Sequence, residues 1–251
     1  MRLNLIDQQK IRIGSCAWSF DDWRGVFYPH DLPESHWLQF YAQYFPTIEV
    51  DSTFHAAPAE NSVLGQKLQV ILIQLPPSLT PDDGKQALRK FLVQLPRDLR
   101  FAIEFRHAGW HRPQFIRLLE KYRICWVWTD TTPLNERNLA PFEFLPCTAD
   151  FVYLRLLGDY ATKYDVDGGH VHRYGKLLWK REAALESWSL KIQRHFPDVR
   201  SVWAFAGNHF EGFAPETCQR LAQRLGFDLA LPSQCQQAFS ADTRSQLDLD
   251  L

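Results

Sequence analysis

Residues 70–110 read VILIQLPPSLTPDDGKQALRKFLVQLPRDLRFAIEFRHAGW, and this stretch decides the expected fold class. Its apolar run Val70–Gln74 predicts a strand, the spacing of apolar residues over Gly84–Leu95 predicts a helix, and the run Phe101–Glu104 predicts a second strand. A strand, a helix and a strand in this order form one βα unit, in which the two strands pair in parallel. We therefore expect an α/β protein with a parallel sheet.

The same alternation extends in both directions along the chain. Further strands are predicted at Ile11–Gly14, Thr47–Val50, Ile124–Asp130, Phe151–Arg155 and Val202–Ala206. Further helices are predicted at Glu34–Phe45, Arg112–Tyr122, Leu177–His195 and Pro215–Leu225. Seven strands that alternate with helices are one βα unit short of the eight in a standard (β/α) barrel.

Length and composition set the class of protein. A chain of 251 residues with 45% hydrophobic content suits one large core, so we expect a single domain over residues 1–231 and a polar tail over 232–251. The net charge of -1 gives no overall attraction to nucleic acid or to an anionic membrane. No apolar stretch reaches the roughly 18 residues of a spanning helix, so we expect a cytoplasmic protein without membrane contact.

Six motifs along the chain resemble those of one known family. In order, they are IGSCAWSFDDWRGVFYP, IEVDSTFHAAP, VILIQLPPSL, FAIEFRHAGW, VYLRLLGDYATKY and FAGNHFEGFAP. Together they resemble the YecE-like family, defined by a domain of unknown function, over most of the chain. The resemblance implies a TIM-barrel fold. It implies no particular reaction, because no activity is established for the family.

The chain departs from the family pattern at two places. Members of the family usually have a further βα unit, with a lysine on its strand, between the positions that match Val63 and Leu64. This chain lacks the unit, which accounts for the count of seven strands and removes part of the expected wall of the site. In addition, Gly207 stands beside Asn208 where the family more often has a second Asn.

Polar residues gather at the carboxyl ends of the predicted strands. Residues two positions apart on a strand share a face, and three such pairs occur near strand ends. They are Glu49 and Asp51, Glu104 and Arg106, and Tyr153 and Arg155. Barrel enzymes place their catalytic groups at this end, so we expect one opening that is lined by these side chains, by Asp130 and by Asn208. Glu–Arg pairs also form buried ionic layers that only orient loops, and this alternative stays open.

Loops after the strands supply further candidates for ligand binding. The last loop, AGNHFEGFAP, has the pattern of an anion site before a helix, with Asn208 and His209 as contacts. The long segment after the strand at 151–155 mixes aromatic rings with cations, which suits a sugar or base that carries a phosphate. Its candidates are Tyr160, Lys163 and Tyr164, and Trp18 is a candidate stacking platform. A capped helix, a solvated loop and ordinary packing are the alternatives for these residues.

Four carboxylates at one opening also fit a divalent metal, because hard cations prefer oxygen ligands. Such a site would use Glu49, Asp51, Glu104 and Asp130, with His107 as a further ligand. The sequence has neither a GxGxxG nor a GxxxxGK[ST] loop, and therefore no nucleotide cofactor motif.

Two classes of function fit these residues. The first is an enzyme, a lyase, isomerase or hydrolase that acts on a small anionic or sugar-like molecule, with Glu104 as acid or base and Arg106 and Arg155 as anion clamp. The second is a binding or regulatory module that holds an anionic ligand without converting it. Nucleic-acid binding through Lys163–Arg181 is a third hypothesis, and the neutral net charge argues against it. The oligomeric state stays open.

Overall fold

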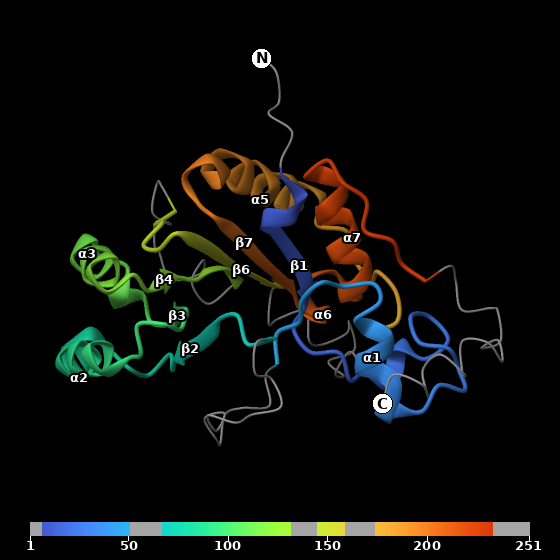
Figure 1. The fold of residues 1–251 in the computed structure, drawn as a ribbon, viewed down its shortest axis with the longest axis horizontal. Coiled ribbons are helices and arrows are strands. Elements are labelled where there is room, and N and C mark those ends of the chain that lie inside the picture. Colours follow the sequence, from blue (N-terminus) through green and yellow to red (C-terminus); the bar gives the residue numbers. More distant parts are fainter. Residues whose placement is uncertain (1–6, 51–66, 132–144, 159–173, 233–251) are drawn as a thin grey trace, which may run out of the picture.

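The computed structural model describes residues 7–50, 67–131, 145–158 and 174–232, and its strands form two parallel sheets (Figure 1). In the first sheet the order is β1 (Ile11–Ser15), β7 (Ser201–Ala206), β6 (Phe151–Gly158) and β5 (Trp128–Thr131). In the second sheet the order is β2 (Ile71–Leu75), β3 (Phe101–Phe105) and β4 (Cys125–Trp126). The described residues thus confirm an α/β fold with parallel sheets, and within these ranges the strands do not close into a barrel.

The two sheets meet along one run of chain. Only Val127 separates β4 from β5, and its amide donates a hydrogen bond to the carbonyl of Ile103 on β3 at 2.9 Å. The single strand predicted over Ile124–Asp130 is therefore two short strands, each paired to a different neighbour. The predicted strand Thr47–Val50 is reduced to one parallel bridge between Cys16 and Glu49, which places Glu49 beside the end of β1.

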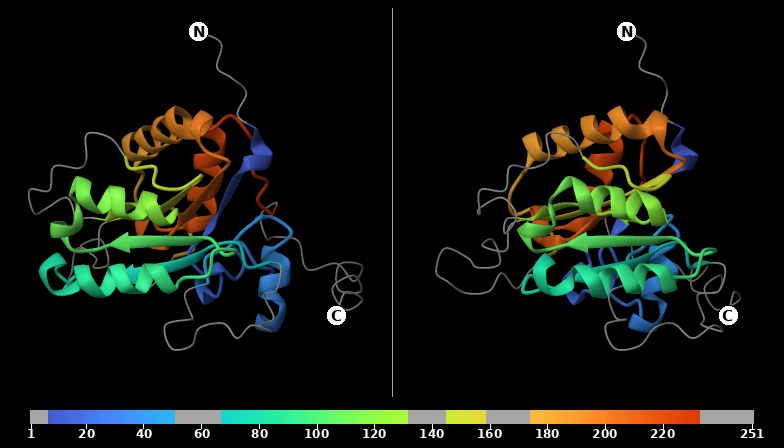
Figure 2. Two further views of the ribbon diagram at one scale, coloured as in Figure 1. Left: turned by 60° about the vertical axis from the view of Figure 1, so that its left-hand side comes forward. Right: turned by 90° about the vertical axis from the view of Figure 1, so that its left-hand side faces the viewer.

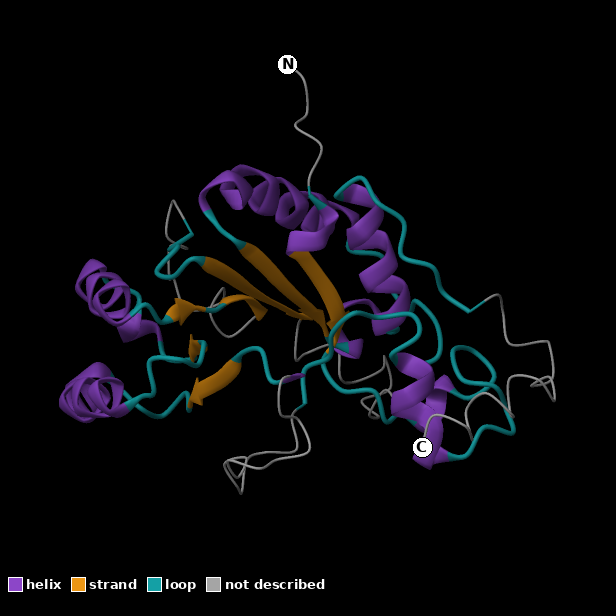
Figure 3. Ribbon diagram, in the orientation of Figure 1, coloured by secondary structure: helices purple, strands orange, loops and turns teal. Residues whose placement is uncertain are grey.

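Helices cover one side of the sheets. They are α1 (Trp37–Tyr41), α2 (Pro81–Gln94), α3 (Pro113–Tyr122), α5 (Glu182–His195), α6 (Asn208–Glu211) and α7 (Ala214–Arg224). In Figure 3 the helices α5 and α7 lie along β1, β6 and β7, whereas α2 and α3 lie side by side next to the other sheet, an arrangement that both views of Figure 2 repeat. No helix in the described ranges is both long enough and apolar enough to cross a membrane.

The helix ends follow from local chemistry and from one tertiary contact. Thr80 caps α2 by accepting a hydrogen bond from the amide of Asp83 at 3.3 Å, and proline occupies the first turn of α2. The helix predicted from Leu177 begins only at Glu182, because the amides of Leu178 and Trp179 donate to the carbonyl of Glu211 instead of to the helix.

The two faces of the sheets bury different clusters of side chains. On the helix side, Leu154 and Ala204 belong to the large core that also includes residues of α5 and α7. On the opposite side, Tyr153, Trp203 and Phe205 belong to a second, smaller apolar cluster. Side chains alternate along a strand, so Arg155, two positions after Tyr153, lies on this second face. A positively charged side chain is therefore buried beside the smaller cluster.

Candidate functional site

Arg155 on β6 lies between two carboxylates that come from different parts of the chain. Its Nη2 donates to Glu49 Oε1 at 2.6 Å, and its Nη1 donates to Glu104 Oε2. The side chains of Arg155, Glu49 and Glu104 are only 7%, 4% and 1% exposed. Removing charges from water to this extent is costly unless they are paired, and this triad supplies the pairing.

The neighbouring strands complete the cluster around the triad. Gln74 stands opposite Glu104 in the β2–β3 register and donates to Glu104 Oε2 at 2.9 Å. Arg106 follows β3 and donates through Nε to Glu104 Oε1 at 3.2 Å. On β6, the hydroxyl of Tyr153 donates to Glu49 at 2.8 Å. We call Glu49, Gln74, Glu104, Arg106, Tyr153 and Arg155 the polar cluster.

Electrostatics within the polar cluster shift the pKa values of three of its members. Burial raises the pKa of Glu104, but the positive charges of Arg155 and Arg106 and the hydrogen bond from Gln74 outweigh burial, and the net pKa is lowered. Glu104 is therefore a carboxylate at neutral pH. Burial and the charge of Glu49 raise the pKa of Tyr153, so its hydroxyl stays protonated. The pKa of Arg155 is raised because the two carboxylates outweigh the effect of burial.

Two buried polar atoms beside the triad have no partner among the described residues. They are Nε of Arg155 and Oγ1 of Thr129. Thr129 stands opposite Arg155 in the β5–β6 register, so the two side chains project to the same face of the sheet. Buried polar atoms usually find a partner in the protein or in water, so these two atoms are exceptions that lie next to the triad.

The structure separates Asp130 from the polar cluster, contrary to the expectation of one shared opening. In the β5–β6 register Asp130 stands opposite Leu156, which faces the helices. Its carboxylate forms an ion pair with Arg181 at 2.8 Å, just before α5. Position near a strand end does not bring a side chain to the cluster, because successive residues project to opposite faces.

The candidates outside the strands have other contacts. Asn208 is buried, and its Oδ1 accepts from the amide of Ala214 at 3.0 Å, which fixes the start of α7. His209 Nδ1 lies 3.0 Å from the hydroxyl of Tyr174. The carbonyl of Trp18 accepts from Tyr28, and its side chain packs against the main core. The predicted site residues Asp51, Tyr160, Lys163 and Tyr164 lie outside the described residues.

The residues that were proposed as metal ligands do not assemble in the described part of the chain. Glu49 and Glu104 both face Arg155, and Asp130 lies on the opposite face. His107 accepts a hydrogen bond from the amide of Gly109 at 3.0 Å. Across the described ranges, no three His, Cys, Asp or Glu side chains come together in a way that could hold a metal ion.

Comparison with protein families connects this geometry to known proteins. Residues 12–65 and 61–238 match the model of the family described as protein of unknown function DUF72, which is the YecE-like family. The chain belongs to the DUF72 family. The two matched segments of this DUF72 chain overlap at residues 61–65, the place of the expected departure from the family pattern.

Solved DUF72 structures share the fold of this protein. One, from Thermotoga maritima MSB8, is 21% identical with a TM-score of 0.69, and the match covers 86% of this chain and 99% of that one. Another, from Enterococcus faecalis V583, is 18% identical with a TM-score of 0.62, and the match covers 89% and 99% of the two chains. No curated protein matches the chain. At these identities the comparison supports the fold of the DUF72 protein and assigns it no ligand.

Sequence reasoning missed three contributors to the cluster of this DUF72 protein. Gln74 ends the predicted strand Val70–Gln74 and is not among the predicted site residues, whereas the register of β2 and β3 places it against Glu104. Cys16 lies in the bridge with Glu49, and burial together with the charge of Glu49 raises the pKa of its thiol, so the thiol stays protonated. Thr129 precedes the expected Asp130 and shares the face of Arg155. Of the three, only Gln74 could have been found from the sequence. Side chains alternate along a strand, and this alternation places Gln74 on the same face of the sheet as Glu104.

Proposed function

We propose that this DUF72 protein binds a small anionic or sugar-like molecule at the carboxyl ends of its strands, with Arg106 as the contact for the negative charge. One observation carries the proposal: Arg106 is 30% exposed, while the Glu104 that holds it through Nε is 1% exposed. A guanidinium that is fixed by a buried carboxylate is preorganised for a carboxylate or phosphate ligand.

Arg155 has a different role in this proposal. Both of its terminal nitrogens donate to carboxylates, so it neutralises Glu49 and Glu104 and orients them. The two arginines, which were expected to bind an anion together, therefore have separate roles in this proposal. Arg106 contacts the ligand, and Arg155 is a positioning residue whose unpartnered Nε adds a buried donor on the inner side.

The fold on which this proposal rests is an incomplete (β/α) barrel that forms a single domain over residues 1–231. Support comes from the continuity of β4 and β5, which links the two sheets, and from Glu49, which adds a bridge outside β1. The sequence between Glu49 and β2 lacks the βα unit that the family pattern has, and β2 is half-buried along its whole length. The likeness to solved DUF72 structures supports the same fold.

An enzymatic function is the second candidate, and the protonation state of Glu104 limits it to one form. A carboxylate with a lowered pKa is ionised at neutral pH, which excludes Glu104 as a general acid and leaves it only the role of a weak general base. Proton abstraction next to a carbonyl or carboxylate, as in a lyase or isomerase, would use Glu104 as the base and Arg106 to stabilise the negative charge that develops.

Ligand binding by matched variants tests the proposal. The protein is titrated with phosphate, malate and ribose 5-phosphate by calorimetry, and Arg106→Gln is compared with Arg117→Gln, an exposed position on α3. We expect at least one of these anions to bind, the affinity to fall about 10-fold or more in Arg106→Gln, and no change in Arg117→Gln. Equal affinity in both variants would overturn the proposal.

Turnover separates the two candidate functions. Glu104→Gln keeps the size of the side chain and removes its charge. If ligand affinity is preserved while a measured conversion of the same ligand is abolished, Glu104 acts as a base. If affinity alone is lost and no conversion occurs in the unaltered protein, the protein is a binding module.

A further inference from the structure

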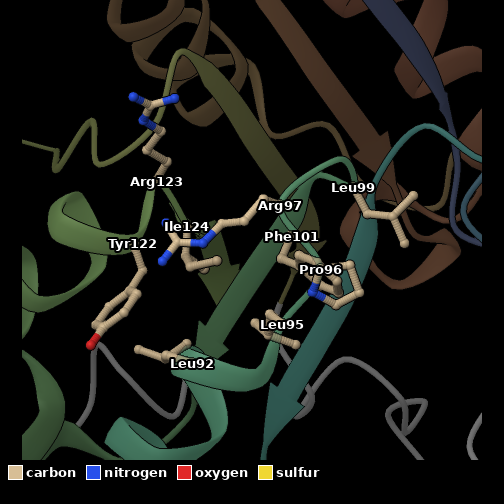
Figure 4. A pocket seen from close by; sticks show the side chains of 9 residues that line it. All are labelled: Leu92, Leu95, Pro96, Arg97, Leu99, Phe101, Tyr122, Arg123 and Ile124. Carbon is tan, nitrogen blue, oxygen red and sulfur yellow. The ribbon is translucent and has the colours of Figure 1, made fainter.

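A pocket lies at the opposite end of the same strands from the polar cluster (Figure 4). It opens between the carboxyl-terminal ends of α2 and α3, where β3 begins at Phe101 and Ile124 precedes β4. Its volume is about 80 Å³, and its lining includes the apolar side chains of Leu92, Leu95 and Phe101. Because Phe101 begins β3 and Glu104 lies near its end, this α2–α3 pocket is separate from the site of the proposed function.

Two arginines border the α2–α3 pocket without a carboxylate partner. Both Arg97 and Arg123 are exposed, and neither forms an ion pair with a described residue. The guanidinium of Arg97 lies 5.9 Å from the centre of the Tyr122 ring. In Figure 4 the Arg97 side chain extends across the apolar floor toward Tyr122 and Ile124, while Arg123 points away from the floor. The Arg97 side chain therefore lies beside the apolar part of the pocket, where a ligand head group can contact it.

The chain segment that carries the pocket has a net positive charge, although the protein as a whole does not. Residues 85–123, which include most of α2 and all of α3, contain ten Lys and Arg against three Asp and Glu. The rest of the chain contains 18 against 26, so the net charge of -1 conceals two regions of opposite sign. A local positive field favours anions at this surface.

We propose that the α2–α3 pocket binds a short aliphatic carboxylate, with the hydrocarbon part against Leu92, Leu95 and Ile124 and the carboxylate on Arg97. A volume of about 80 Å³ accommodates roughly five water-sized groups, which matches a hydrocarbon of four to six carbons. The planar guanidinium of arginine matches a carboxylate in geometry and charge. The pocket thus offers an apolar surface and the cation of Arg97. A ligand with a hydrocarbon part and a negative charge fits both.

The test uses 4-methylpentanoate and the full chain with labelled isoleucine and leucine methyl groups. We expect saturable NMR shifts of the Ile124, Leu92 and Leu95 methyl groups with a millimolar dissociation constant. The amide 4-methylpentanamide has the same shape without the charge, and we expect it to bind at least about 10-fold more weakly. Inorganic phosphate, which has charge without hydrocarbon, is expected to leave these methyl groups unshifted.

Three variants assign the site. Arg97→Gln, at an exposed position, is expected to weaken binding of 4-methylpentanoate about 10-fold, whereas Arg117→Gln on α3 is expected to leave it unchanged. Arg106→Gln is expected to leave the ligand-induced shifts of the pocket methyl groups unchanged, which separates this site from the polar cluster. The proposal is overturned if acid and amide bind equally, if Arg97→Gln binds as the unaltered protein does, or if no methyl group of the pocket shifts at about 50 mM ligand.

Discussion

Replacing Arg155 by Met is the perturbation that most strongly tests the electrostatics of the polar cluster. The side chain is 7% exposed and neutralises two carboxylates that are 4% and 1% exposed. Without it, Glu104 keeps its hydrogen bonds from Gln74 and Arg106, but Glu49 keeps only the hydroxyl of Tyr153 among the contacts described above. Removing one member of a buried pair leaves an uncompensated charge, which costs about 3–5 kcal/mol. We expect this loss in the free energy of unfolding at pH 7.

The pH dependence of this loss follows from the pKa of Glu104. In the unaltered protein that pKa is lowered, so the stabilisation is present above the unfolded-state value of about 4.3 and is lost as the pH falls through the folded-state value. In Arg155→Met, Glu104 loses one of its two cations, so its folded-state pKa rises and its protonation removes a buried charge that is no longer fully compensated. The difference in stability between the two proteins should therefore shrink as the pH falls from 7 to 5.

Urea unfolding followed by tryptophan fluorescence at pH 7 and pH 5 measures both effects, provided that the slope of the transition is unchanged. The matched control is Arg200→Met, which removes an ion pair with Asp150 in which the two side chains are 86% and 57% exposed. There we expect a loss of about 1 kcal/mol or less. A loss below about 1 kcal/mol for Arg155→Met, or a loss that is equal at both pH values, would refute the reasoning.

Three further predictions concern the region around α6 and α7 and the buried thiols. The Glu211 carboxylate is completely buried and pairs with Arg220, so Glu211→Ala should lower the free energy of unfolding by about 3 kcal/mol in urea, and an effect below about 1 kcal/mol would contradict this role. Asn208→Ala removes the acceptor for the amide of Ala214 and should lower thermal stability by about 1 kcal/mol without changing anion binding at Arg106; a loss of binding would instead place Asn208 in the ligand site. Burial raises the pKa of Cys125 and Cys218, so both thiols should resist a thiol reagent at pH 8 until urea unfolds the protein, as mass spectrometry of the labelled peptides would show.

The alternation of strands and helices could be predicted from the sequence because it depends on the spacing of apolar residues along the chain. The bounds of β1, β3 and β7 agree with the predicted strands to within a residue. The start of α5 could not be predicted, since Leu178 is held out of the helix by the carbonyl of Glu211, a contact between residues that are distant in sequence. The strand expected near Glu49 is reduced to a bridge for which the sequence gives no local signal.

The polar cluster could be predicted in part. Spacing of two along a strand placed Glu104 with Arg106, and the structure joins them directly. The contact between Glu104 and Arg155 spans 51 positions and depends on how the strands are ordered. Asp130 was included because it ends a strand, but the register of β5 against β6 turns it to the helix side. Face and register, and not nearness to a strand end, decide which side chains meet.

The central claim is that Arg106, held by Glu104, binds an anion at the carboxyl ends of the strands. The most direct measurement is the NMR resonance of the Arg106 side-chain Nε–H group during titration of the full chain with phosphate, malate or ribose 5-phosphate. The account predicts a saturable shift of this resonance, which disappears in Arg106→Gln while the other arginine Nε–H resonances keep their positions. An Arg106 resonance that stays unmoved at saturating concentrations of all three anions would contradict the claim.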